Sequence, residues 1–172
     1  MLFRSSGNKS SSHPDELYSA RLKIIRYFEN RPGNDFEFYG PSWESSHFRN
    51  YKGTVKNKIQ TLKNYRFCIC FENIKNLKGY ITEKITDCFI AGSVPIYWGA
   101  SNITDYIPEN CFIAREKFAS MDALLSFLKN MPEAEYNQYL ENTRRFLESK
   151  KAEKFSDEAV ATSIAKVIVS SP

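Results

Sequence analysis

The fold of this chain is decided by residues 65–99, which read YRFCICFENIKNLKGYITEKITDCFIAGSVPIYWG. Six of the first seven residues are apolar, a pattern typical of a strand that is buried on both faces. Thr82 is a favoured helix N-cap, and Gly92 is well placed to end a helix that runs from residue 83 to residue 90 or 91. A second apolar strand is predicted over residues 94–98. Strand, helix and strand form one βαβ unit, so we expect the two strands to be parallel.

The sequence on either side of this unit continues the same pattern. Short strands are predicted over residues 36–39 and near residue 113. Helices are predicted from about Pro14, Asp15 and Glu16 to just before residue 31, and over residues 56–62, 122–130, 133–149 and 157–169. Strands that alternate with helices favour an α/β fold, in which a parallel sheet is covered by helices on both faces.

The composition is that of a globular domain. The chain has 172 residues, 42% hydrophobic and 26% charged, so we expect a single domain over residues 1–172 and exclude a disordered chain. No apolar run approaches the roughly 18 residues of a transmembrane helix, and the first residues lack the apolar centre of a secretory signal.

Four cysteines without a Cys-x-x-Cys pair, and only two histidines, argue against a metal site. The thiols are predicted to be buried and free, as suits a reducing cytoplasm.

Positive charge is concentrated in one stretch. Residues 45–71 contain no Asp or Glu but carry Arg49, Lys52, Lys56, Lys58, Lys63 and Arg66. This basic stretch is either a solvated face or a field that attracts an anion, such as a nucleotide, a nucleic acid or an acidic membrane surface.

Polar residues gather where the βαβ unit predicts a ligand site, because ligands of open parallel sheets bind outside the carboxyl ends of the strands. That edge is predicted to carry Glu72, Asn73, Tyr80, Thr82, Glu83 and Lys84. The start of the helix offers unpaired N–H groups and about half a positive charge, which suits a phosphate. Lys84, expected to be exposed, adds a full charge, and Glu83 is placed to accept hydrogen bonds from ribose hydroxyls. The structural alternatives are a first-turn acid for Glu83, a surface lysine for Lys84 and a turn former for Asn73.

Arg21 falls within the apolar stripe of the first predicted helix, close to Leu17 and Ile24. Its guanidinium either extends outward to solvent or binds an anion, and a bidentate contact to a pyrophosphate suits an arginine. The glycine-rich fingerprints of P-loop ATPases and dinucleotide-binding oxidoreductases are absent from the sequence, which disfavours those two classes.

Residues 65–73, 80–84 and 91–99, in that order, closely resemble the signature of the α-1,3/1,4-fucosyltransferases of glycosyltransferase family 10. Residues 13–21 and 51–53 also resemble this family, and the likeness extends over about residues 8–113. The resemblance implies a Rossmann-like domain, the C-terminal half of a GT-B glycosyltransferase, which binds GDP-fucose. A helical tail is expected over about residues 150–172, and the resemblance implies that the N-terminal acceptor domain is not part of this chain.

The resemblance also implies roles for the site residues. Arg21 and Lys84 would contact the pyrophosphate and Glu83 the ribose hydroxyls. Asn73 and Tyr80 would contact the phosphate and fucose region, with Glu72 and Thr82 beside them. The reaction would transfer L-fucose from GDP-β-L-fucose to an acceptor glycan, in an α-1,3 or α-1,4 linkage, with inversion and without a metal or other cofactor. The general base would lie in the other domain, so we expect no catalytic residue in this chain and no transfer by this chain alone.

Two other functions are open on the sequence alone. One is the donor domain of another GT-B transferase that uses a different nucleotide sugar, because phosphate and ribose contacts are generic. The other is a nucleic-acid- or protein-binding module that uses the basic stretch; we expect no nucleic-acid partner. Membrane contact through the last predicted helix is a further alternative that we do not favour. We expect a bacterial cytoplasmic enzyme, with the Golgi lumen as the alternative if a membrane anchor has been lost.

Overall fold

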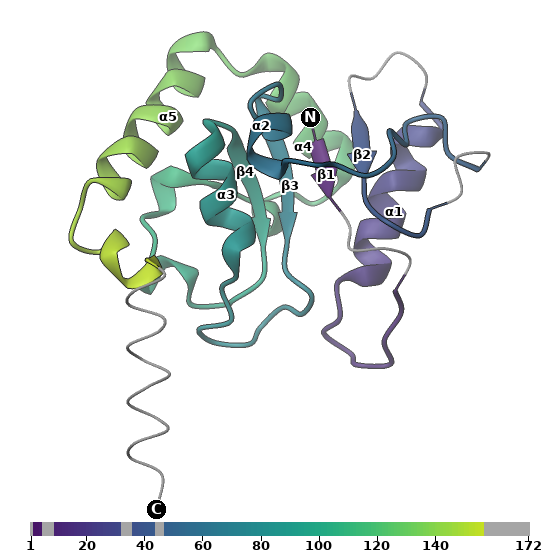
Figure 1. The fold of residues 1–172 in the computed structure, drawn as a ribbon, viewed down its shortest axis with the longest axis horizontal. Helices are drawn as coiled ribbons and strands as arrows, with labels where there is room; N and C mark the ends of the chain where they lie inside the picture. Colours follow the sequence, from purple (N-terminus) through teal and green to yellow (C-terminus); the bar gives the residue numbers. More distant parts are fainter. Residues whose placement is uncertain (1, 5–8, 32–35, 44–46, 157–172) are drawn as a thin grey trace, which may run out of the picture.

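The computed structural model describes residues 2–4, 9–31, 36–43 and 47–156 of the chain. In that part of the chain, five strands form one sheet in the order β2-β1-β3-β4-β5 (Figure 1). The strands are β1 (Leu2–Arg4), β2 (Glu37–Tyr39), β3 (Phe67–Phe71), β4 (Val94–Trp98) and β5 (Ile113–Ala114). All neighbouring strands are parallel, so their C-terminal ends meet at one edge of the sheet, the carboxyl edge, and their N-terminal ends at the opposite one, the amino edge.

The central βαβ unit is confirmed. All five residues of β3 are buried, and β3 pairs in parallel with β4 along its whole length. Helix α3 (Glu83–Ala91) connects the two strands. Its N-cap is Thr82, whose hydroxyl accepts a hydrogen bond from the backbone N–H of Lys84, and Gly92 ends it with a left-handed φ of 71°.

The remaining helices are α1 (Tyr18–Glu29), α2 (Lys58–Leu62), α4 (Met121–Asn130) and α5 (Glu133–Leu147). The last three confirm predicted helices with small shifts at their ends. Strand β1 was not predicted. The helix expected over residues 157–169 lies outside the described residues, as does most of the expected C-terminal tail.

Helix α1 begins later than predicted. Residues 14–16 were expected to start it, but the first helical residue is Tyr18. The chain before it pairs instead with the loop after β3, where the N–H of Leu17 donates a hydrogen bond to the carbonyl of Asn73 (2.9 Å). Tertiary pairing has therefore replaced local helix signals, and it holds the start of α1, including Arg21, against the end of β3.

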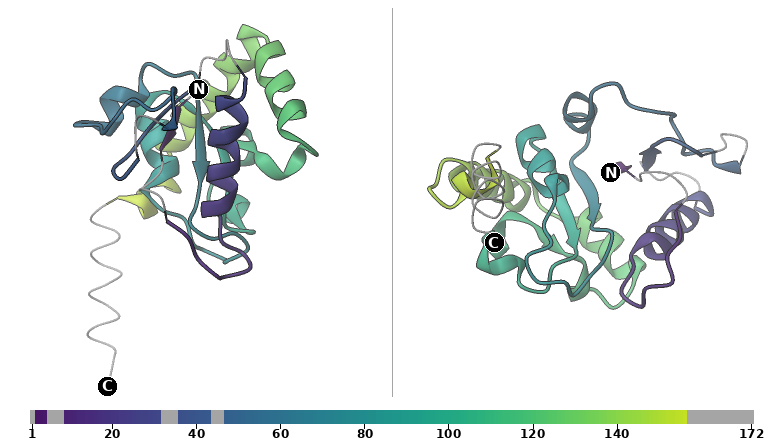
Figure 2. Two further views of the ribbon diagram at one scale, coloured as in Figure 1. Left: turned by 90° about the vertical axis from the view of Figure 1, so that its right-hand side faces the viewer. Right: turned by 60° about the horizontal axis from the view of Figure 1, so that its bottom comes forward.

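Helices cover both faces of the sheet, as predicted (Figure 2). Helices α1 and α4 supply buried residues to one core cluster, with Ile25, Phe28 and Leu124 among them. Helices α2 and α3 supply the other cluster, which includes Ile85 and the thiol of Cys88. Helix α5 contributes to both clusters. The molecule is thus an α/β sandwich whose carboxyl edge is framed by the first turns of α1 and α3.

Candidate functional site at the carboxyl edge

The start of α1, the loop after β3 and the first turn of α3 come together at the carboxyl edge, on the lower side of the molecule in Figure 1. Six of the seven predicted site residues form two hydrogen-bonded groups here. One group is centred on Glu72 and the other on Asn73, which follow one another directly after β3.

The first group joins Glu72 to Thr82 and Lys84. The carboxylate of Glu72 is fully buried, with 0% of its side chain exposed. It accepts hydrogen bonds from the backbone N–H of Thr82 (2.9 Å), from the Thr82 hydroxyl (2.8 Å) and from Nζ of Lys84 (2.8 Å). Nζ of Lys84 also donates to the Thr82 hydroxyl oxygen (2.8 Å). The buried acid therefore anchors both the cap of α3 and the lysine that follows it.

The second group joins Arg21, Asn73 and Tyr80. Arg21 is 2% exposed, and its Nη2 donates to Oδ1 of Asn73 (2.8 Å) and to the carbonyl oxygens of Phe71 (3.0 Å) and Glu72. Nδ2 of Asn73 donates in turn to the Tyr80 hydroxyl (3.1 Å). Arg21 thus caps the C-terminal end of β3 and does not extend into solvent.

The exposure of Lys84 differs from expectation, and Glu83 lies apart from the other site residues. Lys84 was predicted to be exposed, but 24% of its side chain is accessible, because its ammonium turns inward to the buried Glu72. Glu83 is in neither group. Its side chain is 69% exposed, and its carboxylate lies 3.9 Å from Nζ of Lys58 on α2. The described structure therefore brings six predicted residues together and leaves Glu83 on the outer side of the same helix turn.

The electrostatics of this edge favour an anion. The positive end of the α3 dipole faces it, and two cations flank the end of β3: the guanidinium of Arg21 and the ammonium of Lys84, whose charge the Glu72 carboxylate partly neutralises. Burial lowers the pKa of Arg21, although an arginine keeps its charge in proteins. Nε of Arg21 is buried without a hydrogen-bond partner among the described residues. The guanidinium therefore keeps an unused donor.

The cysteine thiols of the core are expected to be unreactive. All four cysteines are buried and free, as predicted. Hydrogen bonding to Cys68 and Cys70, together with burial, raises the pKa of Cys88 well above its ordinary value. Burial also raises the pKa of Cys70. Neutral thiols are poor nucleophiles and poor metal ligands, so these side chains act as core residues.

The basic stretch is largely neutralised by acids from other elements. Carboxylates pair with four of its six cations: Glu29 with Arg49, Glu37 with Lys52, Asp87 with Lys58, and Glu133 with Arg66. The free positive field on which the nucleic-acid alternative depended is therefore much reduced.

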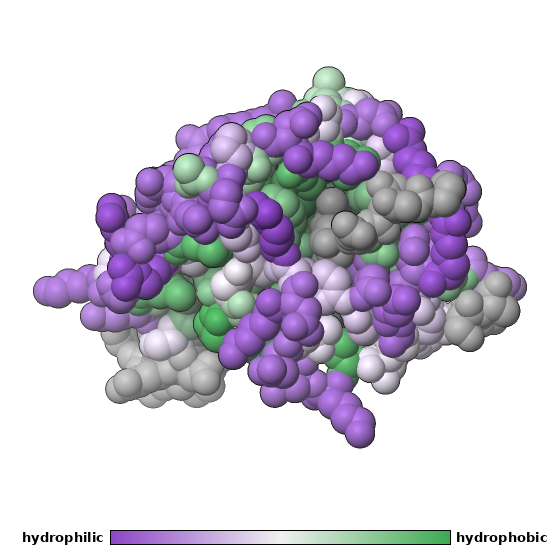
Figure 3. Space-filling model, turned by 90° about the horizontal axis from the view of Figure 1, so that it is seen from above, coloured by the Kyte–Doolittle hydropathy of each residue, from purple (hydrophilic) through white to green (hydrophobic). Residues whose placement is uncertain are grey.

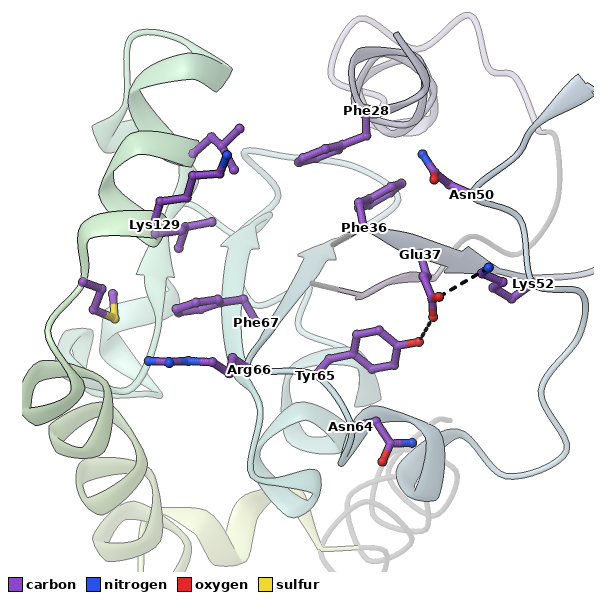
Figure 4. Close-up of a pocket in the computed structure, with 13 residues that line it drawn as sticks. Phe28, Phe36, Glu37, Asn50, Lys52, Asn64, Tyr65, Arg66, Phe67 and Lys129 are labelled. Atoms are coloured by element: carbon purple, nitrogen blue, oxygen red, sulfur yellow. Dashed lines mark hydrogen bonds and ion pairs between the residues drawn. The ribbon is translucent and has the colours of Figure 1, made fainter. Parts of the chain in front are cut away.

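A cavity of about 830 Å³ lies at the amino edge, where no sequence pattern predicted a site. Phe28, Phe36 and Phe67 line its apolar part. At its side, Glu37 accepts a hydrogen bond from Tyr65 and pairs with Lys52 (Figure 4). Figure 3, which views this edge from above, shows apolar residues surrounded by hydrophilic ones. Helix C-termini, whose dipole ends are negative, point toward this edge of a parallel sheet, so it suits a phosphate less than the carboxyl edge does.

Among the described residues, no group of three or more His, Cys, Asp and Glu side chains could hold a metal ion. No helix in the described ranges is both long and apolar enough to cross a membrane.

A parallel α/β domain with two cations and a helix N-terminus at its carboxyl edge has the arrangement that is typical of phosphate- and nucleotide-binding domains. The family model for the C-terminal part of glycosyltransferase family 10 (fucosyltransferase) matches residues 10–167. The chain therefore belongs to this family, as the sequence motifs implied.

Relatives in bacteria, plants and mammals agree with this assignment. The chain is 35% identical over 87 residues to an α-(1,3)-fucosyltransferase of Helicobacter pylori, a match that covers 51% of this chain and 18% of the relative. It is 36% identical over 80 residues to an α-(1,4)-fucosyltransferase of Arabidopsis thaliana, covering 45% of this chain and 20% of the relative. A mouse 4-galactosyl-N-acetylglucosaminide 3-α-L-fucosyltransferase 9 is 44% identical over 78 residues, a match that covers 44% of this chain and 21% of the relative. The matched part is thus about a fifth of each relative.

Solved structures support the fold. A crystal structure of an α1,3-fucosyltransferase with GDP-fucose superposes with a TM-score of 0.60 at 24% identity, covering 81% of this chain and 37% of the other. A structure of an α1,3-fucosyltransferase with GDP gives 0.59 at 23% identity, with the same coverage. The expected fold class, a Rossmann-like parallel sheet with helices on both faces, is confirmed.

Proposed function

We propose that this chain is the donor-binding domain of an inverting fucosyltransferase. It would bind GDP-β-L-fucose for transfer of L-fucose to a hydroxyl of an acceptor glycan, in an α-1,3 or α-1,4 linkage. The observation that carries the proposal is the placement of Arg21 and Lys84 on either side of the end of β3, next to the N-terminus of α3. Membership of family 10, and the GDP-fucose and GDP in the names of related structures, support it.

The chemistry needs positive charge more than it needs a nucleophile in this domain. When the glycosidic bond to fucose breaks, negative charge develops on the leaving GDP. A fixed ammonium, a fixed guanidinium and the positive end of a helix dipole stabilise that charge, and they need no metal ion. Asn73, which is hydrogen-bonded to Arg21, and Tyr80, which is hydrogen-bonded to Asn73, would contact the phosphate and fucose region. Glu83, exposed on the outer side of the turn, would accept hydrogen bonds from the ribose hydroxyls.

The acceptor glycan and the general base belong to the rest of the enzyme in this proposal. No catalytic residue is assigned to this chain, and it would bind the donor without transferring fucose. Detectable fucosyl transfer by the purified 172-residue chain would contradict this part of the proposal. The four free, buried thiols favour a reducing compartment such as a bacterial cytoplasm over the Golgi lumen. Counting free thiols in the denatured protein, taken directly from its native cells, tests the location: four are expected.

The proposal is tested by calorimetric titration of the chain with GDP, with UDP as the competing nucleotide. GDP is expected to bind and UDP to bind at least tenfold more weakly. Lys84→Met keeps the length of the side chain but removes its charge, and should weaken GDP binding by about tenfold to a hundredfold, the worth of one charge-assisted hydrogen bond. Lys52→Met, which removes a paired lysine at the amino edge, is the matched control and should leave the affinity within twofold. Equal affinity for GDP and UDP would favour a transferase for another nucleotide sugar.

A further inference from the structure

The geometry points to Glu72 as a positioning residue, and this inference rests on the proposed function. We propose that Glu72 does not contact the donor but fixes the places of the two cations that do. It is the one described residue that bonds to both: its carboxylate accepts from Nζ of Lys84 (2.8 Å), and its backbone carbonyl accepts from Nη2 of Arg21. The spacing between an ammonium and a guanidinium is thereby set through a single residue.

The Glu72 carboxylate is unsuited to contact an anionic donor, because its own negative charge would repel a phosphate. It is fully buried, and all three of its hydrogen bonds are made within the protein. The N–H of Glu72 donates to the carbonyl of Trp98 (2.8 Å), which continues the β3–β4 ladder by one residue and holds the backbone rigid. Gly99 makes room for the side chain, because a Cβ built there would lie 2.5 Å from Cγ of Glu72 and 2.5 Å from the hydroxyl oxygen of Tyr97. The carboxylate is therefore confined beneath the first turn of α3.

The ion pair with Glu72 fixes the position of Lys84 but does not use all of its hydrogen-bond donors. An ammonium has three N–H donors, and Glu72 and Thr82 accept two of them. The third is left for a ligand oxygen, on a side chain that remains 24% exposed. A lysine held in this way binds an anion without first losing the rotamer freedom of its long side chain. The partial neutralisation of its charge by Glu72 is the cost of that fixed position.

Glu72→Gln is the decisive substitution. Glutamine has nearly the same size, but it carries no charge and presents one acceptor and one donor group where the carboxylate presents two acceptors. Three donors, two from Thr82 and one from Lys84, point at the Glu72 carboxylate. The NH₂ group of a glutamine would therefore face at least one donor without an acceptor between them, and Lys84 would lose its ion pair.

A double-mutant cycle on GDP binding tests the proposal. We expect Glu72→Gln to weaken GDP binding about tenfold and Lys84→Met by at least as much. The double variant should bind no more weakly than Lys84→Met alone, because Glu72 acts through Lys84. The matched pair Glu37→Gln and Lys52→Met, from the ion pair at the amino edge, should change the affinity less than twofold. A purely structural role for Glu72 would instead give losses that add.

The outcomes separate the two proposals. GDP binding by the wild-type chain with no change in Glu72→Gln, or with additive losses, overturns the positioning role alone. No GDP binding by the wild-type chain overturns the proposed function and the role that rests on it. If Glu72→Gln fails to fold, Thr82→Val replaces it, because it removes the hydroxyl between Glu72 and Lys84. That variant should lose about fivefold in affinity, and Thr82→Ser should regain most of it; no regain would contradict the proposal.

Discussion

A lysine is paired with a glutamate at each edge of the sheet, but the two pairs lie in different surroundings. At the carboxyl edge, Lys84 pairs with Glu72, whose side chain is 0% exposed. At the amino edge, Lys52 pairs with Glu37, whose side chain is 35% exposed. Water can take the place of a lost partner at the amino edge but cannot reach the carboxylate at the carboxyl edge. Loss of one partner should therefore be tolerated in the Lys52–Glu37 pair but should destabilise the fold in the Lys84–Glu72 pair.

Arg21 at the carboxyl edge and Arg66 at the amino edge show the same contrast. Arg21 is 2% exposed and donates to the end of β3, whereas the Arg66 side chain is 50% exposed and pairs with the exposed Glu133. Polar groups at the carboxyl edge are bonded to one another away from solvent, whereas those at the amino edge are bonded to protein partners but remain partly exposed. The four predictions below test this contrast, starting with the largest effect.

Arg21→Ala should destabilise the domain most, by about 3–4 kcal/mol in the free energy of unfolding. The substitution removes a buried side chain and leaves the Phe71 carbonyl and the Asn73 amide without a donor. Arg66→Ala, at the amino edge, should cost less than about 1 kcal/mol, because its ion pair is exposed. Urea denaturation of both variants measures the difference, and equal losses would remove the contrast between the edges.

Lys84→Ala should cost about 2–3 kcal/mol, because it leaves the buried carboxylate of Glu72 without its counter-charge. This is toward the lower end of the effect for a buried pair, since the ammonium itself is partly exposed. Lys52→Ala should cost less than about 1 kcal/mol. Adding Glu72→Gln to Lys84→Ala should recover part of the lost stability, since it removes the unpaired charge. A Lys84→Ala variant as stable as Lys52→Ala would mean that Glu72 is not buried as described.

The fold could be predicted where local signals are strong. The apolar run of β3, the N-cap Thr82 and the left-handed Gly92 define the βαβ unit without help from the rest of the chain. Strand β1 could not be found in this way, because three residues show no periodicity and their sheet partners are distant in sequence. The start of α1 was misplaced for a related reason: tertiary pairing with the loop after β3 replaced the local signals.

For the candidate site, the sequence predicted which polar residues lie at the carboxyl edge but not which of them are bonded to one another. The position of a polar residue after β3 or at the start of α3 follows from the sequence. The burial of the Glu72 carboxylate does not, because it depends on the space that Gly99 leaves beside Tyr97 at the end of a different strand. The inward turn of Lys84 follows from that burial. The cavity at the amino edge is equally non-local, since its lining comes from α1, β2, β3 and α4.

Gly99→Ala should cost about 2 kcal/mol and should also weaken GDP binding. A Cβ at this position collides with Cγ of Glu72 and with the Tyr97 hydroxyl, so the carboxylate must shift. Gly92→Ala, at the amino edge, should cost about 1 kcal/mol through its left-handed backbone alone, because nothing lies within 4 Å of the added Cβ. Urea denaturation and calorimetry separate the two variants, and only Gly99→Ala is expected to alter the affinity. An unchanged affinity in Gly99→Ala would show that the position of Glu72 does not matter for the donor.

Glu37→Gln should have the smallest effect, and one that depends on pH. The hydrogen bond from Tyr65, followed by the charge of Lys52, lowers the pKa of Glu37 from its ordinary value of 4.5. A carboxylate with a lowered pKa in the folded state adds stability above its unfolded pKa, and that stability is lost as the pH falls through the folded value. At pH 7 the free energy of unfolding of the wild-type chain should therefore exceed that of Glu37→Gln by less than about 1 kcal/mol, since the carboxylate is partly exposed. This difference should shrink below about pH 4.5 and vanish in stronger acid. Urea denaturation of both proteins between pH 7 and pH 3 measures it, and a difference that persists at pH 3 would mean that the hydrogen bond, and not the charge, carries the contribution of Glu37.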